Sequence, residues 1–184
     1  MDKLLYKNIC ESSAHRLSRE NNAAFIFGNP KLFPELLDIA LNVNDKFHYK
    51  ACWILELVLE NKLEWLLPYL PKFCNSLEQF NHDGALRSIS KIAMFLANQH
   101  LKKPFLSEKQ VQQITESALN WLISDEKVAT KAYAIRTLFQ MGKLQSWIYP
   151  ELILILQQGF SEHSPAYKAV SKEILAKIKR STLP

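Results

Sequence analysis

The stretch of sequence that decides the fold is residues 131–139, Lys-Ala-Tyr-Ala-Ile-Arg-Thr-Leu-Phe, which ends shortly before Gly142. Small residues alternate with large apolar residues at helical spacing, a pattern that is typical of a closely packed, buried helix. Similar segments recur along the chain. The sequence therefore predicts a repeated structure made of helices.

A basic residue marks the same position in four similar helices, at intervals of roughly 40 residues; these markers are Lys50, Arg87, Lys131 and Lys168. The residue after each marker is small, and the residue seven positions after it is long and apolar. Small residues let two helix backbones approach, and long apolar ones fill the space between helical hairpins. The copies agree less well three positions after the marker, where they have Trp53, Ser90, Ala134 and Ser171.

The helices that precede the marked ones also repeat. Residues 33–37 and 149–153 share a Pro-Glu-Leu core, and residues 70–73 are a looser copy. Proline suits the first turn of a helix, where its missing N–H costs nothing. The third copy begins instead with a capping-box pattern at residues 107–110, and Pro68 should break or kink the first helix of the second repeat.

A period near 40 residues with two helices per unit is typical of HEAT and armadillo arrays, in which stacked hairpins bury one another's apolar faces. We therefore predict an all-α fold, a right-handed α-α superhelix of about four hairpins. It would be a single domain, 1–184, with an N-terminal helical cap at 1–30. The expected repeats are about 31–61, 62–103, 104–144 and 145–184. Asp45, Asp125 and Ser164 are the expected N-caps of second helices.

Three segments carry a narrower resemblance: residues 48–56, 127–133 and 147–152. They resemble a family of small bacterial proteins, found mainly in the Bacteroidetes group, over roughly residues 30–178. Members are often named adenylosuccinate lyase, and the resemblance would imply that activity. Lyases of that superfamily carry a Ser-Ser-x-Met-Pro-x-Lys-x-Asn signature. Here Ser12-Ser13 is followed by Ala14-His15, so the residues themselves do not predict lyase chemistry.

Composition and motifs give no indication of an active site. The four glycines are scattered, so they cannot form a phosphate-binding loop. Neither a His-Glu-x-x-His nor a Cys-x-x-Cys motif occurs, so we expect no zinc site and no cofactor. The five histidines are spread along the chain, and we expect surface or capping roles for them.

Three widely spaced cysteines lie in helical apolar patterns, which favours buried thiols in a reducing cytoplasm; they are Cys10, Cys52 and Cys74. The N-terminus lacks the apolar run of a signal peptide. No apolar stretch reaches about 18 residues, the length that predicts a membrane span. We therefore expect a cytoplasmic protein without a membrane partner.

One enzymatic hypothesis comes from DNA glycosylases for alkylated bases, some of which are built from HEAT-like repeats and use a catalytic aspartate near aromatic residues. Trp121 and Asp125 have a compatible spacing. The structural alternative is that Trp121 continues an apolar stripe and that Asp125 caps a helix. We treat the glycosylase as a remote alternative and expect no enzyme.

Charge distribution suggests a binding surface. The chain has a net charge of +5, and its excess of basic residues lies in the second helices, which usually line the concave face of HEAT arrays. The predicted basic face comprises Lys50, Arg87, Lys91, Lys127, Lys131, Arg136, Lys168 and Lys172. Such a face suits an acidic protein segment or a phosphate backbone. Two structural alternatives stay open: the repeated residue bonds carbonyls or acids of the neighbouring repeat, or the face is only solvated.

From these patterns we predict a non-enzymatic HEAT-like scaffold or adaptor that binds a protein partner on its concave second-helix face. The alternative is a nucleic-acid-binding solenoid that uses the same basic face. Nothing in the sequence identifies the partner.

Overall fold

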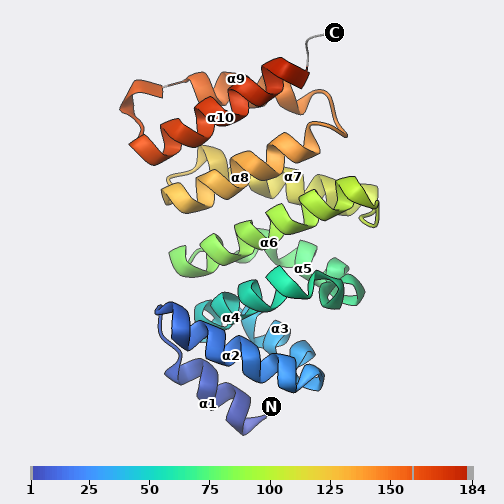
Figure 1. Ribbon diagram of the computed structural model, residues 1–184, viewed down its shortest axis with the longest axis vertical. Helices are drawn as coiled ribbons and strands as arrows, with labels where there is room; N and C mark the ends of the chain where they lie inside the picture. Colours follow the sequence, from blue (N-terminus) through green and yellow to red (C-terminus); the bar gives the residue numbers. More distant parts are fainter. Residues whose placement is uncertain (1, 159, 182–184) are drawn as a thin grey trace. The chain divides into compact units, whose positions relative to one another are not determined.

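The computed structural model describes residues 2–158 and 160–181 as helices joined by short connections, with no strand in these ranges (Figure 1). The all-α prediction is confirmed. Residues 1, 159 and 182–184, which fall in the predicted cap and fourth repeat, lie outside the described residues. The chain forms two compact units, Met1–Ile92 and Ala93–Pro184. The single-domain boundaries stay a prediction.

The N-terminal part of the first unit contains four α-helices. They are α1 (Lys3–Glu11), α2 (Arg16–Gly28), α3 (Phe33–Leu41) and α4 (His48–Asn61), with a short 3-10 turn at Pro30–Leu32. Helices α3 and α4 form the hairpin predicted for repeat one, and α1 and α2 also pack on α4. Buried apolar residues of α1 and α2, such as Leu5 and Ile26, complete this core. The predicted N-terminal cap is therefore a helical pair.

The first helix of the second repeat is broken into short pieces. A 3-10 segment at Leu63–Tyr69 contains Pro68, the α-helix α5 follows at Leu70–Ser76, and a further 3-10 turn spans Leu77–Gln79. Proline has no N–H to donate and its ring crowds the preceding turn, so a regular helix cannot continue through it. The sequence predicts a break or a kink at Pro68, and the structure shows a break. The next helix, α6 (Asp83–Lys102), contains the boundary between the two units.

The second unit consists of the end of α6 with α7 (Glu108–Ile123), α8 (Val128–Met141), α9 (Ile148–Gln157) and α10 (Pro165–Ser181). A 3-10 turn at Phe160–Glu162 precedes α10. Helix α8 packs against α7, α9 and α10, so α7–α8 and α9–α10 form the two hairpins predicted for this region (Figure 1). Among the described residues, none of the helices combines the length and the apolar character that a membrane crossing requires.

Helix ends confirm some predicted caps and correct others. Ser107 and Gln110 form the reciprocal capping box at the start of α7, and the Ser164 hydroxyl accepts the Tyr167 backbone N–H in the first turn of α10. The predictions for Asp45 and Asp125 were wrong. Helices α4 and α8 begin after Phe47 and Lys127, so both aspartates lie in the preceding turns; the Asp45 carboxylate accepts the Phe47 N–H there.

Three of the four positions that lie three residues after a basic marker are small and completely buried. Ser90, Ala134 and Ser171 are all completely buried at this position, so the small side chain is kept where two helices meet. Trp53 is the exception, and its indole N–H donates to the Gly84 carbonyl at 3.1 Å. The position directly after the marker, by contrast, is fully buried only in the first two copies, Ala51 and Ser88.

Gly142 follows α8 at a close contact between two segments. A Cβ at this position would overlap the ring of Tyr149. That ring stacks on Phe139 with a centroid separation of 5.9 Å, and its hydroxyl donates to the Phe139 carbonyl at 3.2 Å. Glycine is therefore required here by space rather than by backbone conformation.

Candidate functional site

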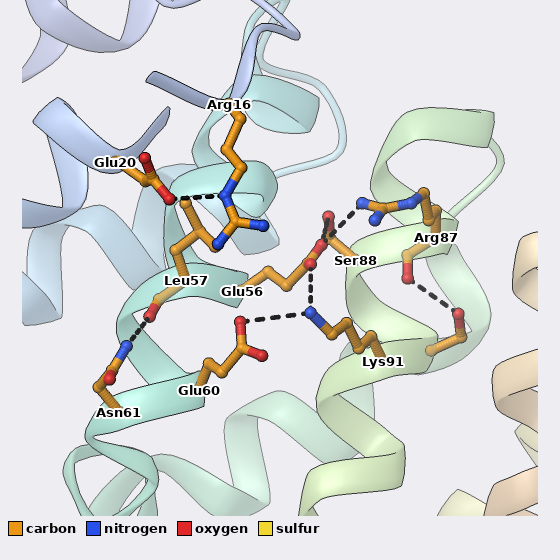
Figure 2. A network of polar contacts seen from close by, with 10 residues as sticks. Arg16, Glu20, Glu56, Leu57, Glu60, Asn61, Arg87, Ser88 and Lys91 are labelled. Atoms are coloured by element: carbon orange, nitrogen blue, oxygen red, sulfur yellow. Dashed lines mark hydrogen bonds and ion pairs between the residues drawn. The ribbon is translucent and has the colours of Figure 1, made fainter. Parts of the chain in front are cut away.

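The basic residues predicted on α6 are bound to a buried carboxylate of α4 (Figure 2). Glu56 is 1% exposed. Its two oxygens accept from Arg87 at 3.0 Å and from Lys91 at 2.9 Å, and the Ser88 hydroxyl donates to it at 2.6 Å. Lys91 also reaches Glu60 at 3.3 Å. Because a buried charge must be paired and hydrogen-bonded, Arg87 and Lys91 serve first to neutralise Glu56.

Lys50 has a similar internal role. Its ammonium group donates to the Cys10 carbonyl at 2.6 Å and lies 5.3 Å from the centre of the Phe47 ring. Lys50 and Arg87 therefore both bond to an earlier helix of the first unit, α1 and α4 respectively. For these two markers the structure shows the contacts expected from the structural alternative that the sequence left open.

The corresponding cluster in the second unit joins α8 to α10. Arg136 binds Glu173 through two parallel hydrogen bonds of 3.1 and 2.9 Å, and Lys177 donates to the same carboxylate at 2.7 Å. The hydrogen bond from Lys177, followed by that from Arg136, lowers the pKa of Glu173. These side chains are all partly exposed, so solvent screens the pairs and limits their contribution to stability. Their main effect is to hold the guanidinium of Arg136 in place.

The remaining predicted basic residues have different surroundings in the second unit. Lys168 donates to the Ser161 carbonyl at 2.8 Å, Lys172 lies 5.9 Å from the centre of the Phe160 ring, and Lys127 precedes α8. Lys131 is half-buried, and the structure gives it no acidic partner among the described residues. The predicted face is therefore largely occupied by interactions within each unit.

A cleft of about 350 Å³ opens on the second helices of the second unit. It is lined by residues of α6, α8 and α10: Met94, Asn98, Tyr133, Arg136, Phe139, Gln140, Ile174 and Lys177. The Oε1 atom of Gln140 is buried there without a hydrogen-bond partner. Only Arg136 of this set was predicted as a site residue. The aromatic and methionine side chains were not, because on a helical pattern they resemble core residues.

The residues of the glycosylase hypothesis lie in structural positions. Trp121 is only 6% exposed, so its ring packs in the core and presents no face to a base. Asp125 is exposed in the turn between α7 and α8. The burial of Trp121 matches the structural alternative, whereas Asp125 does not cap α8 and lies in the turn before it.

Two histidines differ from the expectation of surface or capping roles. His48 and His100 are buried, and burial lowers the pKa of each imidazole because it disfavours the charged form. Cys52 and Cys74 are buried free thiols, and burial raises the pKa of Cys74 to about 12. No group of histidine, cysteine and acidic residues suited to a metal ion occurs within the described residues.

The paired helices of each unit, with small residues buried at a repeated position, are those of a helical repeat protein. The family model of the HEAT repeat domain matches residues 1–178. The chain therefore belongs to the HEAT repeat family. No curated protein and no solved structure matches it significantly.

Proposed function

We propose that this protein is a non-enzymatic HEAT repeat adaptor that binds a protein partner on the second-helix face of its second unit. The observation that carries the proposal is the cleft between α6, α8 and α10. It combines Met94, Tyr133 and Arg136. All three residue types are enriched in protein interfaces, and tyrosine and arginine are also enriched among hot-spot residues.

The charged cluster beside the cleft supports the same function. Glu173 holds Arg136 by two hydrogen bonds, so the guanidinium loses little conformational freedom when a partner binds. The buried Oε1 atom of Gln140 has no partner in the chain, and rotation of this side chain would present it to a donor of the partner. Apolar rings with a few fixed polar groups are typical of a binding pocket.

The nucleic-acid alternative has weaker support. Binding to phosphates requires cations that can exchange their counterions for phosphate oxygens. Arg87 and Lys91 are already neutralised by Glu56, and Arg136 by Glu173. Lys131 and Lys172 are the principal residues left for such contacts. No observation favours base release by a glycosylase.

The test is to capture a partner from the native host, purify it, and measure its affinity by calorimetry. Tyr133→Ala should weaken binding by about tenfold or more, which is the typical cost of removing a hot-spot side chain from an interface. Lys109→Ala is the matched control, since Lys109 is exposed on α7 and outside the cleft. Equal affinities for the two variants would contradict the proposal.

Fluorescence anisotropy with random DNA and RNA tests the alternative. We expect no binding at about 50 mM salt, where phosphate contacts are strong. Binding that falls steeply with salt and is lost in Lys131→Glu would favour a nucleic-acid-binding solenoid instead.

A further inference from the structure

A second and larger cleft of the second unit, about 670 Å³, lies beside α7. Two connections border it: residues 103–107, between α6 and α7, and residues 142–147, between α8 and α9. None of its lining residues belongs to the cleft between α6, α8 and α10. Its volume is within the range typical of ligand pockets.

Buried polar atoms in this cleft have no partner within the chain. Thr115 is 1% exposed, and its hydroxyl makes no hydrogen bond; the Oε1 atom of Gln145 is likewise buried without a partner. Both residues line the cleft. A buried polar atom without a hydrogen bond destabilises the folded state, so a bound group toward which these two side chains rotate would remove that cost.

His100 adds a hydrogen-bond donor to the same cleft. Its Nδ1 atom accepts the backbone N–H groups of Phe105 and Leu106 at 2.9 and 3.0 Å. An acceptor nitrogen carries no proton, so this network assigns the proton of the neutral ring to Nε2. No described residue accepts from Nε2. A backbone carbonyl oxygen of a bound polypeptide could accept the hydrogen bond from this Nε2–H group.

The cleft is negatively charged, which favours a cationic ligand. Its only charged lining residues are Glu108 and Glu116, although the whole chain has a net charge of +5. Gln112 donates to Oε1 of Glu116 at 2.8 Å and fixes that carboxylate. Two carboxylates beside an amide oxygen present acceptors only, which matches a group that is rich in donors.

Trp147 narrows the choice among cations. Trp147 is 51% exposed and lines the cleft together with the exposed Leu144. Tryptophan is the best aromatic surface for a cation, and a planar guanidinium both stacks on it and donates up to five hydrogen bonds. An ammonium group has three donors and stacks less well.

We propose that this cleft binds an arginine side chain of a partner polypeptide. The guanidinium lies against Trp147 and donates to Glu116 and to the Gln145 amide oxygen. Apolar residues next to this arginine in the partner's sequence contact Leu106, Val111 and Leu144. A backbone carbonyl of the partner accepts a hydrogen bond from Nε2 of His100.

The probe is a short acetylated and amidated peptide in which one arginine lies between two leucines. Binding is followed by NMR of the tryptophan indole N–H groups, with the Trp147 signal assigned from Trp147→Phe. The arginine peptide should shift this signal in a saturable way. The same peptide with citrulline, a neutral isostere of arginine, should bind at least about tenfold more weakly.

Variants of the protein connect the binding to the cleft. Glu116→Gln should weaken the arginine peptide by about tenfold, whereas Glu151→Gln, an exposed glutamate of α9 outside the cleft, should have no effect. Tyr133→Ala should also have no effect, so the result is independent of the function proposed above.

Three results would overturn the proposal. They are equal binding of the arginine and citrulline peptides, equal effects of Glu116→Gln and Glu151→Gln, and no saturable shift at millimolar peptide. Sedimentation provides a further check. A dimer of the unmodified chain that dissociates in Glu116→Gln would assign the cleft to a second copy instead of a partner.

Discussion

Replacing Glu56 by glutamine tests whether Arg87 and Lys91 have a structural role. The carboxylate accepts from both cations and from the Ser88 hydroxyl at distances between 2.6 and 3.0 Å. Breaking one partner of a buried ion pair costs about 3–5 kcal/mol. Arg87 is 37% exposed and can turn toward water, so we expect about 3 kcal/mol, near the lower limit of that range.

Glu173→Gln is the matched control, since Glu173 also accepts from one arginine and one lysine. Its side chain is 36% exposed. Solvent screens exposed pairs, so the loss of unfolding free energy should stay below about 1 kcal/mol.

Urea unfolding followed by circular dichroism at about 0.1 and 1 M salt would measure both effects. The Debye length is only about 3 Å at 1 M salt, so the small effect of Glu173→Gln should vanish there while that of Glu56→Gln persists. If the two units unfold in separate transitions, each variant should shift the transition of its own unit. Equal losses for the two variants, or loss of the Glu56 effect in salt, would refute the structural role.

Three further predictions follow from buried groups. Gly142→Ala should lower the unfolding free energy by about 1–3 kcal/mol, because the added Cβ meets the packed ring of Tyr149. A Cβ at Gly28 would have nothing within 4 Å, so Gly28→Ala should be neutral or up to about 1 kcal/mol stabilising. Equal urea midpoints for the two variants would contradict this prediction. A thiol reagent should modify only Cys10 in the native protein, since the other two thiols are buried, and all three in urea; rapid native reaction of all three would be inconsistent with the fold. Because burial lowers the pKa of His48 and His100, the unfolded chain binds more protons than the folded one. The contribution of the two imidazoles to the unfolding free energy is therefore complete above about pH 6.5, and it is lost as the pH falls from that value toward the pKa values of the folded state. NMR titration of the native protein should give both imidazoles midpoints below about 6.5. A midpoint above that value would contradict the prediction.

Local signals predicted much of the fold. The capping box at Ser107 and the break at Pro68 depend on chemistry within a few residues, and both occur where the sequence indicates. Asp45 and Asp125 carry the same local signal, yet α4 and α8 begin later. Cap preference alone therefore does not fix where a helix starts, because tertiary packing also decides it.

The candidate sites were harder to predict because their residues come from separate elements. The sequence showed the basic residues but not their partners: Glu56 lies on the preceding second helix, and Glu173 on the following one. Glu56 did carry a signal, since it interrupts an apolar stripe of α4 where a buried acid must have a cation. The cleft beside α7 had no comparable signal, because two connections and a helix assemble it.

The completely buried serines and alanine at positions 90, 134 and 171 also limit how this chain can diverge. Charges on the solvent side can be exchanged between lineages at little cost, because they contact mainly water. A completely buried methyl or hydroxyl group in a close-packed interior leaves little volume for a larger substituent. Related sequences should therefore drift in their surface chemistry long before they change at these three positions.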